Sequence, residues 1–527
     1  MKKWSVISIL VIAQFIMILD STVMNVSLST VAKDLGTTIS GMQAAITFYA
    51  LTMASLMLTG GKFGDILGRR GAFKIGVAVY GVGSFITSVS PSLTVLLIGW
   101  SLIEGLGAVL VIPAIAALAA VNYQGHDRII AFASIGAVSG IAAALGPLIG
   151  GFVTTYFSWR YVFLSETVIM AILLLVANRI SDVKIVHKSK IDSLSVILSV
   201  IGMAILVFGV LQSKVWGWVQ PIDTPTINGQ SIDPLGISVV AYMIVAGFFL
   251  LWWFYRRQLA LERNGGATLL KVSLLSKRPL RSGLTTLLSQ YLVIAAIFFV
   301  VPVYLQIILG YDALKTGIKI LPLSVALVCT SLVGVRATRR LPPRRIVRSG
   351  QVALVLGVLL LMAAINPELK GFLFGLGMFV MGAGLGLLAS QLGNVNMSAV
   401  GETNSAEGGG LQGTSQNLGS SLGTALIGSI FISALTSGFL ATVQTSTLPA
   451  SIKSYIASNA QPGLQVVSAT QVKQYATSKG SSESEASQIS SIYTEAQIDG
   501  LRRSLFYLAV IAFFSLLASR YVPSQKT

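Results

Sequence analysis

GKFGDILGRRGAFK, residues 61–74, stands between two long apolar segments of the chain. Gly61 allows a helix end to pack closely against a neighbour, and Gly68 permits a tight turn. Asp65 precedes Arg69 by four residues, so the two side chains can pair or cap the start of a neighbouring helix. The stretch therefore predicts a short charged turn between two apolar helices.

Apolar segments continue on both sides of this turn along nearly the whole chain. Each is about long enough to cross a bilayer as a helix, which takes roughly 20 residues. Only helices satisfy their own backbone hydrogen bonds over spans this long and this apolar. The sequence thus predicts an all-α membrane protein with fourteen transmembrane helices. They lie near residues 5–31, 41–61, 72–90, 93–121, 129–155, 161–180, 192–212, 236–255, 282–309, 315–335, 350–365, 371–392, 412–440 and 503–521.

The composition agrees with a surface that faces lipid. Hydrophobic residues make up 54% of the 527 and charged residues only 11%, whereas soluble domains carry about 25% charged residues. The mean hydropathy is +0.79. Cys329 is the single cysteine, so no internal disulfide can form and no cysteine-based metal site is expected. His126 and His187 both fall in predicted loops, and we expect no metal and no cofactor.

The basic residues indicate how the helices are oriented. An even number of helices places both termini on one side of the membrane, and Lys and Arg concentrate on the cytoplasmic side. With the termini inside, 26 of the 37 basic residues fall in cytoplasmic segments. We therefore expect a multi-pass protein of the plasma (inner) membrane with both termini cytoplasmic. The net charge of +18 then faces anionic lipid, so VRATRRLPPRRIVR at 335–348 predicts a membrane-flanking loop and no nucleic-acid partner.

Residues 441–500 form a long polar segment, rich in Ser, Ala, Gln and Thr, between the last two apolar segments. In the expected orientation it lies outside the cell. Two parts of it, 451–460 and 481–498, have the pattern of short amphipathic helices. The segment is either a solvated cap or a gate or docking element for a partner, and the sequence leaves both interpretations open.

Several motifs resemble those of one transporter superfamily. LDSTVMNVSL at 19–28 resembles a segment of the fourteen-helix drug:proton antiporters, although Ser29 replaces the proline that follows in that family. FSWRYVFL at 157–164 stands in that family's usual place. The turn at 61–74 matches the signature G-x-x-x-D-x-x-G-R-R/K of the major facilitator superfamily at Gly61, Asp65, Gly68, Arg69 and Arg70.

The segment GAVSGIAAALGPLIGG, residues 136–151, is similar to the antiporter motif of the same superfamily. Glycines four residues apart form a smooth helix face that another helix can approach closely, and a proline bends the helix. We expect a close helix contact here, either as tight packing alone or as a control on which side the cavity opens. The matched positions are Gly136, Gly140, Gly146, Pro147, Gly150 and Gly151.

The resemblance implies the major facilitator fold, with two six-helix bundles, two extra helices and a substrate site between the bundles near mid-membrane. The expected division is 1–185 for the N-terminal bundle, 186–260 for the two additional helices, and 261–527 for the C-terminal bundle with its 441–500 segment. The resemblance also implies a proton-coupled antiporter that exports small amphipathic or drug-like compounds, with the proton gradient as its driving force. The expected partners are the substrate, protons and membrane lipids, and the expected state is a monomer.

Three acidic residues fall inside apolar segments of the first half: Asp20, Glu104 and Glu166. A carboxylate at membrane depth costs about 2.5–3.5 kcal/mol on insertion scales, so it usually faces a cavity or a partner. Burial favours its neutral form, which suits reversible protonation. The family pattern R-x-x-Q-G is replaced here by Ser101 to Gly105, so an arginine is missing and Glu104 stands for glutamine. We hypothesise that Glu104 or Glu166 shares the proton-carrying role with Asp20. The alternative for each is a carboxylate hydrogen-bonded near a helix end.

Polar and aromatic residues on the predicted helices are candidates for a mixed cavity lining. The segment 315–335 contains no acid, so a second site for a cation is not evident, and a neutral, amphipathic or lipophilic monocationic substrate fits. The candidates are Asn25, Tyr49, Trp100, Tyr291, Phe298, Tyr304, Gln306, Gln391, Asn394 and Gln416.

Other functions are compatible with the same fold. A dedicated transporter of one endogenous metabolite or lipid is the first alternative, and a membrane receptor that binds a ligand without moving it is the second. An enzyme is not expected, because the chain has no H-E-x-x-H, G-x-S-x-G or P-loop motif.

Overall fold

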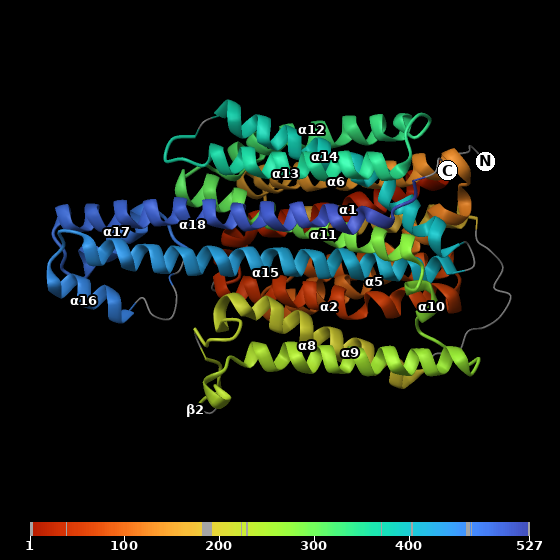
Figure 1. Cartoon of the computed structure of the whole chain (residues 1–527), viewed down its shortest axis with the longest axis horizontal. Helices are drawn as coiled ribbons and strands as arrows, with labels where there is room; N and C mark the ends of the chain where they lie inside the picture. The colour runs from red at the N-terminus through yellow and green to blue at the C-terminus, as the bar shows by residue number, and fades with distance from the viewer. Residues whose placement is uncertain are drawn as a thin grey trace.

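The computed structural model describes residues 4–37, 39–181, 192–222, 224–227, 230–369, 371–401, 404–459, 464 and 466–524. Within them, 14 helices are long and apolar enough to cross a membrane, which confirms the predicted number. The chain is thus a multi-pass membrane protein. Figure 1 shows the long helices running side by side, with both marked termini at one end of the molecule. We call this end the terminal end and the opposite one the distal end.

The first half contains α1 to α7. Proline and glycine positions interrupt these helices little. The fourth span consists of three consecutive helical segments, α4, η1 and α5, and the middle one, η1, is π-helical. The elements are α1 (Ser5–Asp34), α2 (Ile39–Leu67), α3 (Arg69–Ser88), α4 (Leu93–Leu96), η1 (Leu97–Glu104), α5 (Gly105–Asn122), α6 (Gly125–Tyr156), α7 (Arg160–Val176) and η2 (Ala177–Arg179).

A helical pair with a short hairpin between its members follows. The pair packs together, and α8 contacts both α2 and α15, so it covers one seam of the molecule (Figure 1). The elements are α8 (Ser193–Trp216), β1 (Thr226–Ile227), β2 (Gln230–Ser231), η3 (Pro234–Gly236) and α9 (Val239–Arg263). In the hairpin, β1 pairs with β2 in antiparallel register, Thr226 opposite Ser231.

The second half contains the remaining spans and a group of helices at the distal end. The ninth span combines α11 with the π-helical η4. The elements are α10 (Val272–Leu275), α11 (Arg278–Pro302), η4 (Val303–Ile308), α12 (Ala313–Ala337), α13 (Pro343–Ala364), α14 (Gly371–Val400), α15 (Ser405–Thr445), α16 (Ala450–Asn459), α17 (Ala469–Ser478), α18 (Glu483–Ala518) and η6 (Ser519–Tyr521).

Two large hydrophobic cores divide the molecule. One lies among the first six spans, with its buried residues between Val6 and Ile180, joined by Met397 from α14. The other gathers buried residues between Leu287 and Val522. Two separate cores are what two helical bundles require. The expected chain division at residues 186 and 261 stays a prediction, and residues 182–191 lie outside the described part.

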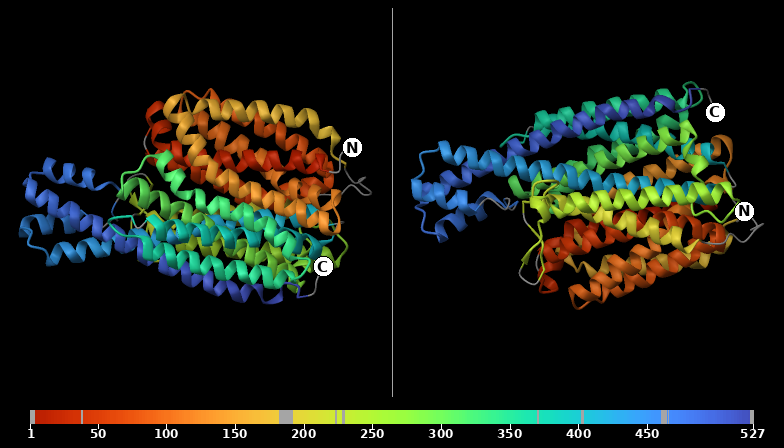
Figure 2. Two further views of the ribbon diagram at one scale, coloured as in Figure 1. Left: turned by 90° about the horizontal axis from the view of Figure 1, so that it is seen from above. Right: turned by 60° about the horizontal axis from the view of Figure 1, so that its bottom comes forward.

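The distal end carries a lobe of α16, α17 and the protruding ends of α15 and α18 (Figure 2). The short helix expected at 451–460 is confirmed as α16, but 481–498 is not a separate short helix. It is the first half of the 36-residue α18, because Ser482 and Glu485 form a capping box that starts the helix there. Tyr493 then packs edge-on against Phe439 of α15, with ring centroids 5.5 Å apart, so the helix stays continuous into the membrane span.

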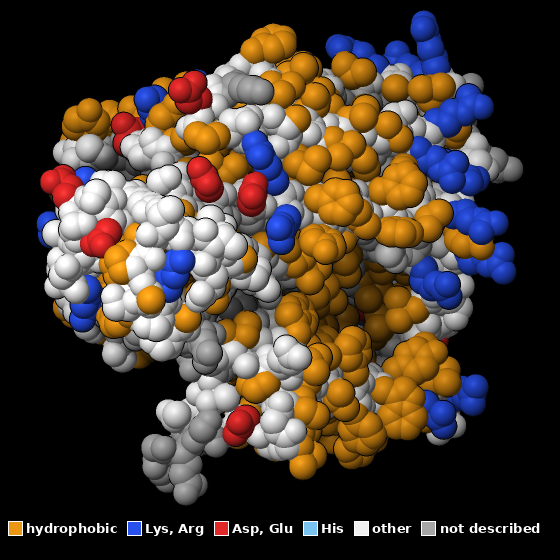
Figure 3. Space-filling view, turned by 60° about the vertical axis from the view of Figure 1, so that its left-hand side comes forward, with side chains coloured by type: hydrophobic (Ala, Val, Ile, Leu, Met, Phe, Trp, Pro, Cys, Tyr) orange, Lys and Arg blue, Asp and Glu red, His pale blue; other side chains and the backbone are white. Residues whose placement is uncertain are grey.

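Charge is distributed unevenly along the molecule. Most Lys and Arg side chains visible in Figure 3 gather at the terminal end, and a broad band of hydrophobic side chains separates them from the lobe. This is the asymmetry that the basic residues of the sequence predict for a membrane protein.

The bundles meet along two seams. On one, α6 of the first bundle packs against α12 and α14 of the second; on the other, α15 packs against α2 and α5. The glycine motif of α6 serves both kinds of contact. Gly136 faces Ala389 and Gly140 faces Leu327, both across the seam, whereas Gly146 and Gly150 face α1 within their own bundle. The first glycine pair thus contacts the second bundle, and the second pair contacts α1 of its own bundle.

We expect Gly136→Ala to destabilise the protein. A Cβ at this position would lie 2.5 Å from the Cβ of Ala389, which is backbone-anchored and cannot rotate away. Overpacking of this kind costs about 1–3 kcal/mol, and it should lower the thermal unfolding temperature of the detergent-solubilised protein. Gly375→Ala is the matched control, because nothing lies within 4 Å of a Cβ there. Equal unfolding temperatures for the two variants would contradict the seam described here.

Candidate functional site

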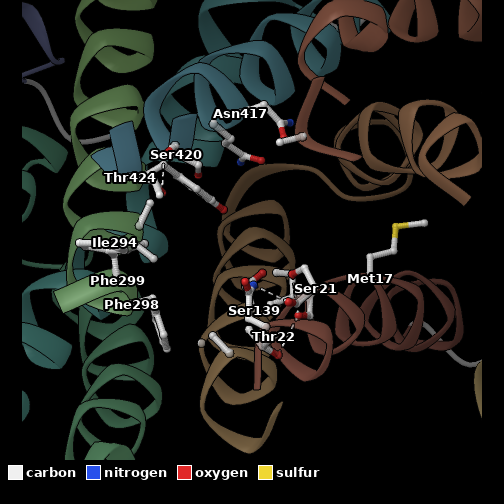
Figure 4. A pocket seen from close by; sticks show the side chains of 18 of the residues that line it. Met17, Ser21, Thr22, Ser139, Ile294, Phe298, Phe299, Asn417, Ser420 and Thr424 are labelled. Carbon is white, nitrogen blue, oxygen red and sulfur yellow. Dashed lines mark hydrogen bonds between the residues drawn. The ribbon is translucent and has the colours of Figure 1, made fainter. Parts of the chain in front are cut away.

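A cavity of about 1240 Å³ lies between the two bundles. Its walls come from α1 and α6 on one side and from α11 and α15 on the other, as Figure 4 shows with Ser21 and Ser139 facing the side of Phe298 and Ser420. Leu464 also lines it, so the cavity extends to the distal lobe. A space of this size accepts a drug-sized molecule.

The cavity lining is apolar with scattered uncharged polar groups. Among the described residues that line it, none is Asp, Glu, Lys or Arg. Four polar residues of α15, each four positions after the last, form a stripe on the cavity side: Gln412, Gln416, Ser420 and Thr424. Sequence reasoning identified only Gln416 of these, although residues at this spacing share one helix face and could have been found. Other lining residues that it missed include Gln14, Ser21, Ser139, Gln290, Phe299 and Asn417.

Most of the predicted lining residues do face the cavity. They are Asn25, Tyr49, Trp100, Tyr291, Phe298, Gln306 and Gln416. Three others are not among its lining residues. The hydroxyl of Tyr304 donates to the Asn366 carbonyl oxygen at 2.8 Å, and Gln391 donates to the Gly334 carbonyl at 3.4 Å. Asn394 accepts from Arg128 at 2.9 Å and so belongs to the seam.

The structure brings the three predicted membrane acids together. One oxygen each of Asp20 from α1, Glu104 from η1 and Glu166 from α7 lies within 4.8 Å of the others. All three side chains are fully buried. We call this group the carboxylate cluster. It lies inside the first bundle, and none of its members lines the cavity.

The carboxylate cluster has few partners. The indole N–H of Trp100 donates to both carboxylate oxygens of Asp20, at 2.9 and 3.1 Å. Within the described part of the chain, no hydrogen bond reaches either oxygen of Glu104 or of Glu166, or the buried hydroxyl of Tyr80. The hydroxyls of Tyr80 and Ser84 lie near Glu104, and that of Ser84 also lies near Glu166. Among the described residues no ion pair includes any of the three acids.

These observations limit the charge that the carboxylate cluster can carry. Three ionised carboxylates a few ångströms apart, away from water, repel one another strongly and lack compensation. Protons or a bound cation must therefore neutralise most of the charge. Carboxylate oxygens are also ligands for hard cations such as Na⁺, Mg²⁺ and Ca²⁺. The arrangement can take up and release small positive ions out of contact with the cavity.

The local backbone explains how these side chains come together. A Cβ on Gly83 of α3 would lie 2.5 Å from the backbone nitrogen of Glu104, so glycine lets α3 approach η1 closely. The hydroxyl of Ser101 donates to the Ala45 carbonyl at 2.8 Å and ties η1 to α2. Ser101 stands where the family pattern has arginine, so that position adds no cation to the carboxylate cluster. A π-helical segment places side chains differently from an α-helix and often occurs at functional sites.

The signature turn lies at the terminal end. Gly68 has φ 81°, a conformation that favours glycine, and Arg70 donates to the Ile180 carbonyl at 3.2 Å. Arg69 is buried. The side chain of Asp65 lies outside the described part, as does that of Pro147, so the expected Asp65 pairing stays a prediction. Gly61 lies at the seam, where a Cβ on Gly410 would come within 3.4 Å of it.

Contacts between the bundles cross the terminal end of the cavity. Lys62 of α2 forms a buried ion pair with Glu407 of α15, with 3.2 Å between Nζ and Oε1. Arg128 reaches from α6 to Ser398 of α14 at 2.7 Å. A Cβ on Gly409 would lie 2.5 Å from the Pro113 carbonyl oxygen. The cavity is therefore closed at the terminal end.

The FSWRYVFL stretch organises the distal end of the first bundle. Arg160 pairs with Asp34, and the indole N–H of Trp159 donates to the same carboxylate at 3.0 Å. These contacts hold the pKa of the Asp34 carboxyl below its usual value. Arg160 also donates to the Ser90 carbonyl at 2.7 Å, so it joins the ends of α1, α3 and α7.

Two relatives align with most of the chain. A probable actinorhodin transporter of Streptomyces coelicolor is 28% identical over 84% of this chain and 75% of its own. The puromycin resistance protein pur8 of Streptomyces alboniger is 27% identical over 84% of this chain and 85% of its own.

Structure and family comparisons agree on the fold. The crystal structure of the human organic anion transporter MFSD10 superposes with a TM-score of 0.59 at 12% identity, covering 99% of this chain and 100% of that one. Residues 10–424 match the family model described as Major Facilitator Superfamily. The helix count, the two bundles and this match lead to one conclusion: the chain belongs to the major facilitator superfamily.

Proposed function

We propose that this protein is a proton-coupled antiporter that exports small amphipathic or drug-like compounds across the plasma membrane. One observation carries the proposal: a large uncharged cavity lies between the bundles, and a buried carboxylate cluster lies beside it in the first bundle. An antiporter needs one site for its cargo and one for its driving ion. The reaction is transport, with no bond made or broken, and the expected state of the protein is a monomer.

The cavity supports the nature of the cargo. Its aromatic and aliphatic walls favour apolar surface, and the stripe on α15 offers amide and hydroxyl groups for a few polar substituents. A cargo with a full charge would find no opposite charge among the described lining residues. The two relatives, a probable actinorhodin transporter and a puromycin resistance protein, support the export of such compounds.

The carboxylate cluster supports proton coupling. Glu104 and Glu166 are buried, and no hydrogen bond from the described residues reaches their oxygens, so they are best kept neutral. Asp20 has the indole N–H, which favours its ionised form. We assign the exchangeable proton to Asp20. In this assignment Glu104 and Glu166 share that proton with Asp20 within the carboxylate cluster.

Alternating access follows from the seams. The terminal end is closed by the Lys62–Glu407 pair and the close glycine contacts, so cargo would reach the cavity from that end only after these contacts separate. The basic side chains of the terminal end support a cytoplasmic location for both termini. Export then means loading at the terminal end and release at the distal end.

We expect Asp20→Asn to abolish proton-driven transport. In liposomes with an imposed pH gradient, the wild type should move puromycin against its gradient, while the variant should fall to the rate of protein-free liposomes, because an amide cannot carry the proton. Asp233→Asn, at an exposed acid of the distal hairpin region, should keep wild-type transport.

Two further arms of this assay test the alternatives. Competition among unrelated amphipathic compounds supports a broad exporter, whereas inhibition by one metabolite or lipid alone supports a dedicated transporter. Transport driven equally well by a Na⁺ gradient at constant pH, or unchanged transport by Asp20→Asn, would refute the proton assignment.

We expect Glu407→Gln to open the terminal end. The change removes the carboxylate that pairs with buried Lys62 across the seam, and removing one partner of a buried ion pair is strongly unfavourable. A cysteine at the cavity position Ile112, in a Cys329→Ala background, should then react with a maleimide from the terminal side about tenfold faster, because the closed state loses stability. Glu368→Gln, at an exposed acid, serves as the control and should leave the rate unchanged. No acceleration in Glu407→Gln would mean that this ion pair does not hold the terminal end closed.

A further inference from the structure

One side chain belongs to both the cavity and the carboxylate cluster. Trp100 lines the cavity, and its indole N–H donates to both oxygens of Asp20. It is only 1% exposed, so its ring is held tightly on all sides. Among the described lining residues, Trp100 alone has a side-chain hydrogen bond to a member of the carboxylate cluster.

Tyr49 fixes the ring from the neighbouring helix. The two rings stack with centroids 4.8 Å apart and only 6° between their planes, and Tyr49 also lines the cavity. The stacked pair therefore forms part of the cavity wall, with the carboxylate cluster behind it. A flat apolar molecule in the cavity would meet this wall, since aromatic faces favour stacked or edge-on contact.

The chemistry of indole links ring position to charge. Its N–H can only donate, and a hydrogen bond to an ionised carboxylate is about twice as strong as one to a neutral group. An ionised Asp20 thus holds the Trp100 ring in place more firmly than a protonated one. By thermodynamic linkage, anything that holds the ring in that position also favours the ionised form of Asp20.

We propose that Trp100 is the positioning residue that couples cargo binding to proton release, and that the cargo it senses presents a flat aromatic or other apolar face to the Tyr49–Trp100 pair. This inference rests on the proposed function. Cargo that packs on the stacked rings fixes the indole against Asp20, and the proton leaves the carboxylate. A proton that returns to Asp20 weakens the bond from the indole, loosens the wall and releases the cargo. One proton is exchanged on Asp20 in each direction, and no covalent bond to the cargo is made.

The test measures protons released for each puromycin molecule bound. Calorimetric titration of the purified full-length protein in buffers of different ionisation enthalpy gives this number at one pH. Trp100→Phe keeps an aromatic ring for stacking but removes the N–H donor. We expect its affinity for puromycin to stay within about threefold of the wild type, while it releases at least about threefold fewer protons per molecule bound.

Two controls separate coupling from binding. Phe298→Leu changes a cavity wall on α11, away from the carboxylate cluster, and should weaken binding without changing the protons released per molecule. Trp252→Phe makes the same change at an exposed tryptophan of α9 that does not line the cavity, and it should release as many protons as the wild type. If Trp100→Phe does not fold, an isosteric benzothiophene at position 100, which has the shape of indole without the N–H, replaces it in the same titration.

The possible outcomes are distinct. If the wild type releases protons and the variants without the indole N–H at position 100 release as many, the role of Trp100 is overturned and the proposed function stands. A wild type that binds no puromycin, or binds it without releasing protons, overturns the proposed coupling and this inference together. Reduced release in Phe298→Leu to the same extent as in Trp100→Phe would show a general effect of cavity damage and would also overturn the role of Trp100.

Discussion

The organisation of this protein depends on the cost of placing acids in a low-dielectric interior. Asp20, Glu104 and Glu166 are buried where no basic side chain of the described chain pairs with them. A bundle that only needed stability would place apolar residues there, because buried charges without partners are strongly unfavourable. The carboxylate cluster is tolerated when protons or a bound cation cancel most of its charge. The helices around it, with Gly83 against η1 and Ser101 bonded to α2, hold the acids close enough for one event to affect all three.

The cavity and the carboxylate cluster follow opposite physical rules. The cavity is wide, its described lining residues carry no Asp, Glu, Lys or Arg, and it reaches the distal lobe, so its binding energy comes from apolar contact with a few polar groups. The carboxylate cluster is fully buried, so a change of one charge there has a large electrostatic effect. Because the cavity and the carboxylate cluster are separate, a transporter can accept many cargo molecules in the cavity and still select one kind of ion at the carboxylate cluster. The stacked rings of Tyr49 and Trp100 join the two, since they line the cavity and Trp100 donates to Asp20.

Much of the fold could be predicted from the sequence, because lipid imposes a simple rule on each span. Span number and the uneven distribution of basic residues follow from hydropathy and charge alone. The start of α18 could not be placed, because residues 481–498 are too polar to be read as part of a span, although the capping box at Ser482 marks it. The stripe on α15 was readable from its spacing of four. That Asp20, Glu104 and Glu166 meet was not readable, because it depends on how α1, η1 and α7 pack. The same limit applies to Tyr304, Gln391 and Asn394, whose helices are right but whose faces turn away from the cavity.

The 41 residues of α15 run without a break from Ser405 to Thr445. At 1.5 Å per residue this helix is about 60 Å long. It carries the buried ion-pair partner Glu407 near one end, the cavity stripe near its middle, and the contact of Phe439 with α18 in the distal lobe. A rigid rod pivoting near its centre moves its two ends in opposite directions, and a tilt of about 10° displaces each end of a rod this long by about 5 Å. The distal lobe and the contacts at the terminal end are thus joined by one continuous helix, and a tilt of this helix moves both. A spectroscopic label on the lobe would therefore report whether the contacts at the terminal end are closed, although they lie a full membrane thickness away.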